Sequence, residues 1–600
     1  MDLLKELTLK GKLVFVVIHQ PSSELFKMFD KLLIIDEGGY LIYKGNPVDS
    51  IVYFKTKANF ANWNDSECPV CGNVNPDQIF NIIESRILDE YGNVTQTRKI
   101  SPKEWNDFLE NKKEAENEKH EKLQLQKEIP DNPFKIPNKL RQFKVFITRD
   151  VISKLNNKQY LIINIFETPL LTFLLSYIVK YYSIDVTNVL GYTLYDNSNL
   201  PIYIFMAVII AIFVGLTVSA EEIIKDRKIL KRERFLNLSW SSYLLSKVAI
   251  LLVLSAIQSF IFVLIGNSIM EIKGMFFEYW IVLFSAWSCA NLLGLNISDS
   301  FKTAVTIYIL IPFLVIPQLI LSGIVVPYDK LNPEISSTGT IPFYGEIITA
   351  RWAYEALAVK QFKDNEFEKQ FYPYDKIMSI ADYKKNYWLR TLSNKIIDCE
   401  RYLNNPKKKN VVENNLILLR NEIKKELKEN DKFKFDQLNK LYYDSLNSSV
   451  ISSVNNYFNL LNRYYIKLYN KANLLKDELI SQQQQTKEEK YKFILQKKKY
   501  TNRALTDFVC NSNSLERIVE YKGHLYQKIN PIFHDPESNF IKAHFYAPRK
   551  KLFGNYYSTF WLNVIVIWVM NLLFYITLYY RLFRKLINSI PDIFSKKKRF

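Results

Sequence analysis

Cysteine is scarce in this chain, whose 600 residues contain only five. Cys68 and Cys71 form a C-P-V-C turn like half of a zinc ribbon, but no second C-x-x-C follows to complete four ligands. We therefore interpret the pair as a metal-free turn, with zinc bound jointly with a partner chain as the alternative. Cys289 lies in an apolar run as a small filler. Cys399 and Cys510 share one long loop and could pair if that loop faces an oxidising compartment.

The sequence lacks the signals that mark several classes of protein. The first residues, MDLLKELTLKGK, contain no apolar core, so no signal peptide is expected. No G-x-x-x-x-G-K-[ST] phosphate-binding loop occurs, so this chain alone is expected neither to bind nor to hydrolyse ATP. The formal net charge is +19, but the positive residues gather beside apolar runs and at the last residues. That placement favours membrane topology and anionic lipid, and we expect no nucleic-acid partner.

Long apolar runs are what the sequence does contain. The mean hydropathy of −0.10 averages them with very polar stretches and so decides nothing. Six runs have about the 20 residues that a hydrocarbon core requires: 160–182, 201–221, 243–266, 277–297, 304–326 and 559–582. The sequence thus predicts an α-helical membrane protein with six transmembrane helices, a small N-terminal α/β segment and a long helical extracytoplasmic insertion.

A dense charge cluster separates the second and third runs. Glu221 and Glu222 end the second run, and the basic stretch 225–234 follows. Two spans joined by a basic loop place that loop in the cytoplasm. The segment 137–158 reads as a basic amphipathic helix that lies along the membrane surface. Its Arg149 could pair with either glutamate at the base of the second span.

The first 54 residues alternate apolar strands with short helices. We expect a helix over 2–9, a buried strand over 12–18 and, after an exposed polar turn, a helix over 24–30. A second buried strand over 31–36 leads through a Gly-Gly hairpin into 40–43. This alternation predicts an α/β layer with a parallel element.

One string within this segment is specific. V-V-I-H-Q-P-S-S-E-L-F-K-M-F-D-K-L-L-I-I-D-E-G-G resembles the switch-histidine segment of ABC ATPases, in the form typical of the G subfamily (the white and pleiotropic-drug-resistance type). The resemblance implies that His19 contacts the γ-phosphate of ATP. Gln20, Pro21 and Ser22 are carried over only as the frame of the motif. The family's phosphate loop and signature precede this histidine, so the chain resembles the C-terminal part of a longer transporter, either a fragment or an internal start.

The charge cluster extends the resemblance. The acidic pair, the K-x-x-x-R-E-R string and the following S-x-Y-L-L-S-K resemble a cytosolic helix of the same family, which passes the motion of the ATP-binding domain to the spans. The resemblance implies a coupling role for residues at this cytoplasmic face: Glu221, Glu222, Arg232, Glu233, Arg234 and Arg149.

The chain divides into six regions on these grounds. A polar region with a packed helix over 76–89 and a solvated charged helix over 103–128 follows the ATPase remnant, and the stretch around 341–357 resembles the family's short outer helices. The region 376–500 reads as two or more long helices, a coiled hairpin. The regions are an ATPase remnant (1–54), a polar linker (55–136), a connecting helix (137–158), spans one to five (159–326), an extracytoplasmic domain (327–558), and the sixth span with a basic tail (559–600).

The leading hypothesis is the membrane part of an ATP-driven exporter that works by alternating access. The resemblance implies a homodimer or a half-transporter heterodimer, ATP and Mg²⁺ in the complete protein, and a multi-pass location in the plasma membrane (the inner membrane in a bacterium). Helical position suggests four pathway side chains, with ordinary packing as the alternative for each: Phe205, Phe213, Phe313 and Leu321. The competing hypothesis is a non-transporting membrane scaffold or receptor whose helical outer domain binds a partner.

Overall fold

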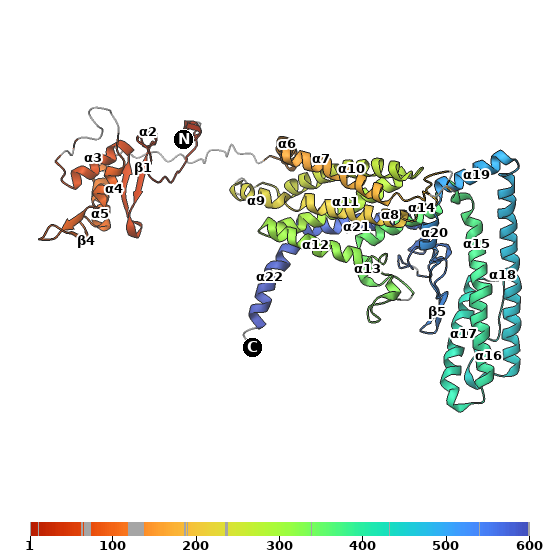
Figure 1. Ribbon diagram of the computed structural model, residues 1–600. Helices are drawn as coiled ribbons and strands as arrows, with labels where there is room; N and C mark the ends of the chain where they lie inside the picture. The colour runs from red at the N-terminus through yellow and green to blue at the C-terminus, as the bar shows by residue number, and fades with distance from the viewer. Residues whose placement is uncertain are drawn as a thin grey trace. The chain divides into compact units, whose positions relative to one another are not determined.

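A computed structural model describes the chain except residues 1, 10, 62–63, 65–73, 118–136, 185–187, 189, 234–237, 338, 431, 539 and 598–600. The described residues fold into two compact units, Met1–Phe134 and Lys135–Phe600, whose elements are labelled in Figure 1. Each unit has hydrophobic core residues of its own.

The first unit combines short helices with two β-hairpins. Strands β1 and β2 pair antiparallel, and Gly38 and Gly39 turn between them with φ of +83° and +81°, values that glycine adopts without strain. The hairpin, α3 and α5 enclose a core around Phe54 and Trp105. The elements are α1 (Asp2–Leu9), α2 (Ser23–Lys27), β1 (Leu32–Ile35), η1 (Glu37–Gly39), β2 (Leu41–Gly45), α3 (Pro47–Lys57), α4 (Asp77–Ile83), β3 (Arg86–Leu88), β4 (Val94–Arg98) and α5 (Pro102–Asn117).

The buried strand expected over 12–18 is wrong for this chain. Among the described residues no strand pairs with this segment, and Leu13, Phe15 and Val17 are 83%, 77% and 90% exposed. A strand is buried only when neighbouring strands satisfy its backbone groups. Among the described residues of this unit, strands pair only as the two antiparallel hairpins, so the expected parallel element is absent from them too.

Two other expectations for this unit need correction. The helix expected over 76–89 ends at Ile83, and the chain turns into the β3–β4 hairpin, which the sequence analysis missed. The charged helix expected over 103–128 is described as α5 up to Asn117, the rest lying outside the described residues, and α5 is not simply solvated. Its Trp105 and Leu109 are 0% and 2% exposed, and Trp105 packs edge-on against Phe54 with ring centroids 5.0 Å apart.

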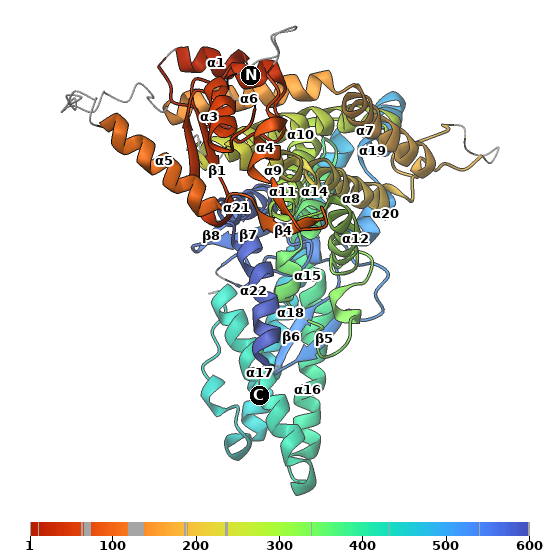
Figure 2. The same ribbon diagram turned by 90° about the vertical axis from the view of Figure 1, so that its left-hand side faces the viewer.

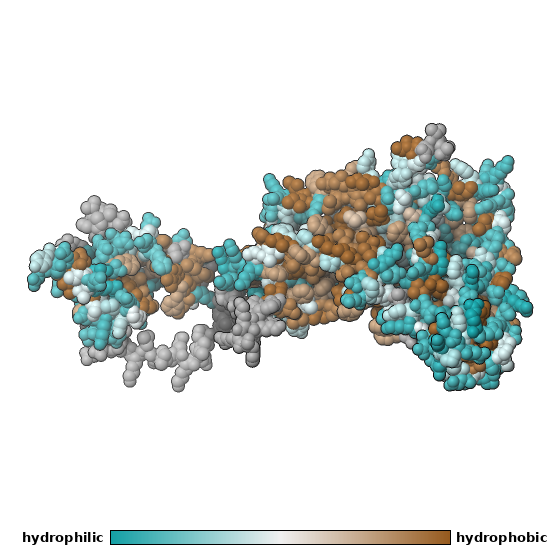
Figure 3. All heavy atoms as spheres, turned by 60° about the horizontal axis from the view of Figure 1, so that its bottom comes forward, coloured by the Kyte–Doolittle hydropathy of each residue, from teal (hydrophilic) through white to brown (hydrophobic). Residues whose placement is uncertain are grey.

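The second unit is built on a bundle of apolar helices. Five are long and apolar enough to cross a membrane, and a sixth, α12, has 17 residues. Figure 3 shows hydrophobic side chains over this bundle. Its elements are α6 (Lys139–Asn156), α7 (Lys158–Val179), α8 (Leu200–Ser219), α9 (Glu222–Arg232), α10 (Trp240–Met270), α11 (Phe276–Ser300), α12 (Ala304–Ile320), α21 (Thr559–Tyr579) and α22 (Leu582–Lys597).

Small residues let the two central helices approach closely. A Cβ atom added to Gly215 of α8 would lie 2.8 Å from the Trp287 carbonyl of α11, and one added to Gly294 would lie 1.9 Å from the Ser219 hydroxyl. Small residues at such contacts are typical of packed membrane helices. The fifth apolar helix ends at Ile320, six residues before its expected end, because the chain turns through Gly323 at φ +77°.

After α12 the chain turns back, and its helix α14 packs within the bundle before the chain continues into the insertion. Helix α14 packs against α8, α11 and α21, consistent with the short outer helices that were expected. Of two antiparallel hairpins, β7–β8 packs on α21 and completes the cap of the bundle, whereas β5–β6 packs on α17 of the insertion. The elements of the cap are η3 (Tyr328–Lys330), α13 (Phe343–Ile347), α14 (Thr349–Lys363), α20 (Arg503–Val509), η9 (Pro531–Phe533), β7 (Arg549–Leu552) and β8 (Asn555–Ser558), and the hairpin on the insertion is β5 (Ile518–Tyr521) and β6 (His524–Gln527).

The long insertion forms a helical domain with its own core rather than a simple coiled hairpin. Figures 1 and 2 both show α15 to α18 side by side, and they share a cluster of buried leucine, isoleucine, valine and aromatic side chains. Its elements are η4 (Glu368–Gln370), α15 (Tyr372–Tyr383), η5 (Lys384–Trp388), α16 (Leu389–Tyr402), η6 (Pro406–Lys408), α17 (Lys409–Glu429), η7 (Leu438–Lys440), η8 (Tyr443–Ser445), α18 (Ser448–Gln482) and α19 (Lys487–Tyr500).

The three cysteines that the structure describes are free and buried. Cys289 lies in α11, as expected for an apolar filler. Cys399 belongs to the core of the insertion, whereas Cys510 belongs to the core of the bundle. The two do not pair, and the disulfide considered from the sequence is not formed.

Candidate functional site

The short helix α9 begins where the apolar run of α8 ends, and the last turn of α11 holds its first residues. The backbone N–H groups of Ile223 and Ile224 donate to the Ser298 hydroxyl at 3.1 and 3.2 Å. Farther along α9, the Arg227 guanidinium donates to the carbonyls of Ser298 and Asp299 at 3.2 and 2.8 Å. The two backbone bonds use N–H groups that a helix start leaves without intrahelical partners, and with the Arg227 bonds they fix α9 to α11.

A buried ion network then joins α9 to α6 and α10. The Lys247 ammonium of α10 lies 3.2 Å from Glu222 and 2.9 Å from Asp226 of α9, and 2.8 Å from Asp150 of α6. Lys154 of α6 bonds to the other carboxylate oxygen of Glu222. The side chains of Lys247 and Glu222 are only 4% and 8% exposed. Removing one partner from such a buried network costs about 3–5 kcal/mol, because the remaining charge is left without compensation.

Glu221 points to a different helix. Its carboxylate accepts a hydrogen bond from the Tyr308 hydroxyl of α12 at 2.8 Å and pairs with Lys225 at 2.6 Å. The two consecutive glutamates therefore divide their contacts, Glu221 toward α12 and Glu222 toward α6 and α10. Through this acidic pair and its neighbours, α9 contacts four other helices of the bundle.

The structure corrects the partner expected for Arg149. Its guanidinium donates to both carboxylate oxygens of Glu233, at 2.9 and 3.1 Å, and does not pair with Glu221 or Glu222. Arg149 thus pairs with the residue that follows the last turn of α9, whereas Lys154 pairs with Glu222 at its start. Arg232 is exposed, and Arg234 lies outside the described residues.

The basic partners of the acidic pair were not among the residues predicted from the sequence. Lys247 was visible as a single cation within an apolar run, and an ionisable group in such a run is by default a candidate functional residue. Asp150 and Lys154, four residues apart on α6, carry no such signal, because the helix around them is charged on most faces. Their role follows only from the packing of α6 on α10.

A second buried polar cluster lies at the other end of the bundle. Arg351, Glu355 and Lys550 are almost completely buried; Glu355 lies 3.0 Å from Arg351 and 2.6 Å from Lys550. The Asn563 amide of α21 donates to Glu355 at 2.9 Å and to the Trp352 carbonyl at 3.0 Å. This cluster joins α14, β7 and α21, so the returning segment is held by charge as well as by apolar packing.

The predicted nucleotide motif lies on an exposed turn of the first unit. His19 and Gln20 are exposed, and Gln20 has φ of +50°. Ser22 has a structural role, since its hydroxyl accepts from the N–H of Leu25 and caps α2. The sequence contains no G-x-x-x-x-G-K-[ST] phosphate-binding loop. The γ-phosphate contact of His19 stays a prediction, as does zinc, because Cys68 and Cys71 lie outside the described residues.

The four suggested pathway residues differ in how far their side chains are buried. Phe205 is 5% exposed and packs edge-on against Tyr354 with centroids 5.9 Å apart, as a core side chain does. Phe213 and Phe313 are 40% and 68% exposed, and Leu321 is half-buried against the core. Phe213 and Phe313 therefore remain available for contact with lipid, a partner or a substrate.

Apolar helices of this length, locked at one end by a buried ion network, define a multi-pass integral membrane protein. Residues 141–362 match the membrane domain described as an ABC-2 type transporter. The chain therefore carries an ABC-2 transporter membrane domain, which includes α9, α10, α11 and α12 and all of α6 from Arg141 onward.

Three relatives illustrate the resemblance to the G type. Protein white of Drosophila melanogaster is 38% identical over 79 residues, 13% of this chain and 10% of that protein. ABC multidrug transporter I of Aspergillus fumigatus is 32% identical over 126 residues, 20% of this chain and 7% of that protein. ABC transporter G family member 22 of Arabidopsis thaliana is 31% identical over 134 residues, 21% of this chain and 18% of that protein. The chain thus matches less than a fifth of the length of each of these relatives.

Proposed function

We propose that this chain is the membrane part of an ATP-driven ABC exporter of the G type. The observation that carries the proposal is the attachment of α9, which is bonded to α6, α10, α11 and α12 within the segment that matches the ABC-2 domain. If α9 were attached only through its connecting loops, those loops would absorb its displacement and the apolar helices would not move. Because α9 is held by buried charges, a force applied to it moves the apolar helices.

The proposed working unit is a dimer. In it, closure of two ATP-binding domains displaces α9 of each protomer, and a path between the protomers changes its accessible side. The ion network is suited to this role because its partners lie on several helices and are withdrawn from water. Such a network has discrete arrangements rather than a continuous range.

The first unit has an exposed apolar surface on which the rest of an ATP-binding domain would pack. No described strand pairs with the stretch 12–18, whose Leu13, Phe15 and Val17 are exposed, and β1 exposes Leu33 and Ile35 by 47% and 67%. Apolar strand edges of this kind are normally covered. We propose that further strands of an ATP-binding domain, on this polypeptide or another, cover this face and supply the phosphate loop and Mg²⁺, with His19 at the nucleotide.

The test is ATP-dependent transport by the complete transporter in proteoliposomes, measured together with ATPase activity. His19→Ala is expected to abolish both activities, and Lys247→Met is expected to abolish transport while retaining nucleotide binding. Lys44→Ala, an exposed change on β2 of the same unit, is the control and should leave both unchanged. Full transport by either of the first two variants would contradict the proposal.

The helical insertion favours a second candidate, a membrane scaffold or receptor. It has its own buried core and extends from one end of the bundle, as a partner-binding domain would. This candidate predicts no ATPase activity in any complete form of the protein, and partner capture that survives His19→Ala.

A further inference from the structure

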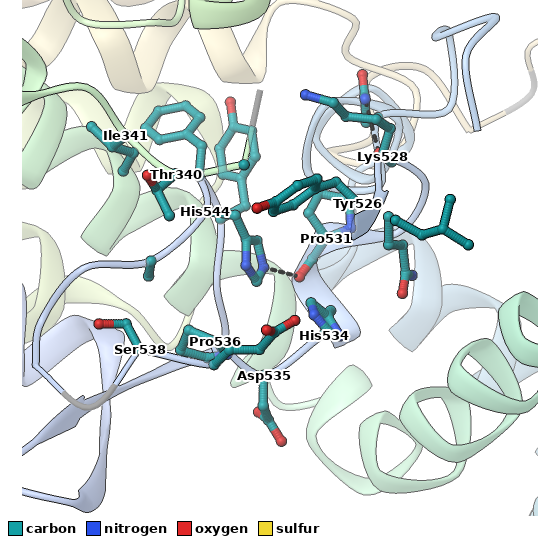
Figure 4. A pocket seen from close by; sticks show the side chains of 18 of the residues that line it. Thr340, Ile341, Tyr526, Lys528, Pro531, His534, Asp535, Pro536, Ser538 and His544 are labelled. Carbon is teal, nitrogen blue, oxygen red and sulfur yellow. Dashed lines mark hydrogen bonds between the residues drawn. The ribbon is translucent and has the colours of Figure 1, made fainter. Parts of the chain in front are cut away.

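A large cavity lies between the insertion and the cap of the membrane helices. Its volume is about 1140 Å³, slightly above the range of about 300–1,000 Å³ that is typical of sites for drug-sized ligands. Helices α15 and α17 of the insertion line one side of it, β6 contributes Leu525 and Tyr526, and cap residues that include Tyr328 and His544 line the other side. Figure 4 shows His544, His534 and Tyr526 around this space. Because one wall belongs to the insertion, the cavity exists only in a protein that carries this domain.

The charge of the lining is unbalanced. Eight lysines and six carboxylates line the cavity, and most of the carboxylates are already engaged. Glu537 pairs with Lys425, Glu429 with Lys384 at 3.3 Å, and Asp329 with Lys528 at 3.1 Å. Two other carboxylates bond to groups outside this set of lysines. Asp535 binds Arg549 and Lys376, and Glu422 accepts from the Trp388 indole N–H and the Leu525 backbone N–H.

The remaining cations are therefore in excess. Five lining lysines have no carboxylate partner among the residues that the structure describes: Lys330, Lys424, Lys428, Lys542 and Lys551. They come from three separate parts of the chain, the cap loop, α17 and the segment at β7. Lys551 is half-buried and the other four are exposed, and together they give the lining of the cavity a positive potential that favours an anion.

The histidines supply polar groups without adding charge. Their rings lie 5.3 Å apart between centroids, and burial lowers the pKa of both His534 and His544. The Nε2 of His544 lies 2.9 Å from the Pro531 carbonyl. A neutral ring must donate its proton to that carbonyl, which leaves Nδ1 as an acceptor. Tyr328 and Phe545, packed edge-on at 6.0 Å, add an aromatic surface to the same cavity.

We propose that this cavity binds a phosphate ester, with the phosphate at the unpaired lysines and the organic body against the aromatic side chains. We favour phosphate over a carboxylate because a carboxylate carries only one negative charge, which is too little to compensate five lysines. Lysine is also a common phosphate ligand. The same chemistry is offered by the headgroup of an acidic lipid and by a soluble organic phosphate. The site lies at the opposite end of the bundle from α9 (Figure 1), so it is distinct from the coupling network.

The experiment measures binding to the purified full-length chain in neutral detergent, without nucleotide. The probes are a short-chain phosphatidic acid, glycerol 3-phosphate, and a short-chain phosphatidylcholine with no net charge. Saturable binding of phosphatidic acid alone identifies a lipid headgroup as the source, and equal binding of glycerol 3-phosphate identifies a soluble ester. Binding of phosphatidylcholine as tight as that of phosphatidic acid, or no saturable binding of any probe, overturns the proposal.

The matched variants test the residues. Lys542→Gln with Lys551→Gln is expected to weaken phosphatidic acid binding at least about tenfold, the loss that follows from one charge-assisted hydrogen bond. Lys467→Gln with Lys471→Gln removes the same charge from exposed positions of α18 outside the cavity and should leave binding unchanged. Lys428→Gln, an exposed change on α17, tests the opposite wall and guards against misfolding of the first pair. Unchanged binding in both cavity variants overturns the assignment. Since neither nucleotide nor transport enters the measurement, its outcome is independent of the proposed exporter function.

Discussion

Lys247 and Glu222 form an ion pair 3.2 Å long that is buried between two helices of the membrane unit. One partner belongs to an apolar helix, α10, and the other to the short charged helix α9. Because α9 begins at Glu222, directly after the apolar run of α8, the pair ties the start of α9 to an apolar helix of the bundle.

Replacement of Lys247 tests this attachment. Lys247→Met leaves Glu222, Asp150 and Asp226 with only one nearby lysine, and is expected to lower the free energy of unfolding by about 3–5 kcal/mol. Thermal unfolding of the purified protein in detergent measures the effect. Lys231→Met, at an exposed position of α9, is the control and should change stability little. Equal stability of the two variants would show that the network is not required for packing.

A charge exchange tests the pairing at the end of α9. Arg149→Glu and Glu233→Arg each remove an ion pair between partly exposed side chains, and the double exchange should restore it. A double-mutant cycle of unfolding free energies is expected to give a coupling energy of about 0.2–1 kcal/mol. The same cycle between Arg149 and Glu222, which are not bonded, should give none. Coupling to Glu222 instead of Glu233 would contradict the structure.

The insertion carries a carboxyl group that should make its stability depend on pH. Burial, assisted by repulsion from Asp375, raises the pKa of Glu368 to about 7. The folded state therefore holds its proton more tightly than the unfolded state does. The resulting stability is present below about pH 4.5 and is lost as the pH rises through about 7.

Glu368→Gln removes that dependence. The variant should gain stability relative to the natural chain as the pH is raised from about 5 to about 8, measured by thermal unfolding across this range. Glu478→Gln, at an exposed position of α18, is the control for loss of one carboxylate. Parallel pH profiles for the natural chain and Glu368→Gln would exclude a raised pKa at this position.

One asparagine holds the start of the second span to the base of the insertion. The Asn502 amide donates to the carbonyls of Leu194 and Asn197 at 2.6 and 2.7 Å, and its oxygen caps α20 by accepting from Leu505 at 2.7 Å. Asn502→Ala leaves these groups unpaired in a buried place and is expected to cost about 2–4 kcal/mol.

Hydrogen exchange locates that loss. Faster exchange is expected in the loop before α8 and in α20, whereas exchange in the core of the insertion should not change. Asn473→Ala, at a partly exposed position of α18, is the control. A uniform increase over the whole unit would indicate global destabilisation and not the local clamp described here.

The sequence alone was enough to predict the apolar helices and the charged boundary between the second and third of them. A run of about 20 apolar residues has few folded solutions other than a buried or membrane-spanning helix, because every backbone group must be satisfied within it. Glu221 and Glu222 could therefore be singled out by position. The helix over 2–9 and the Gly38–Gly39 hairpin followed from equally local rules of periodicity and turn geometry.

The partners of those residues were decided by tertiary structure. Nothing local distinguishes Lys154 from Arg149 as the ligand of Glu222, since the choice depends on how α6 packs on α10. For the same reason the stretch 12–18, apolar enough for a buried strand, stays exposed, because burial requires neighbouring strands that local sequence does not supply. The cavity beside the insertion is the clearest case. Its lysines lie on distant segments, and only the fold brings their charges together.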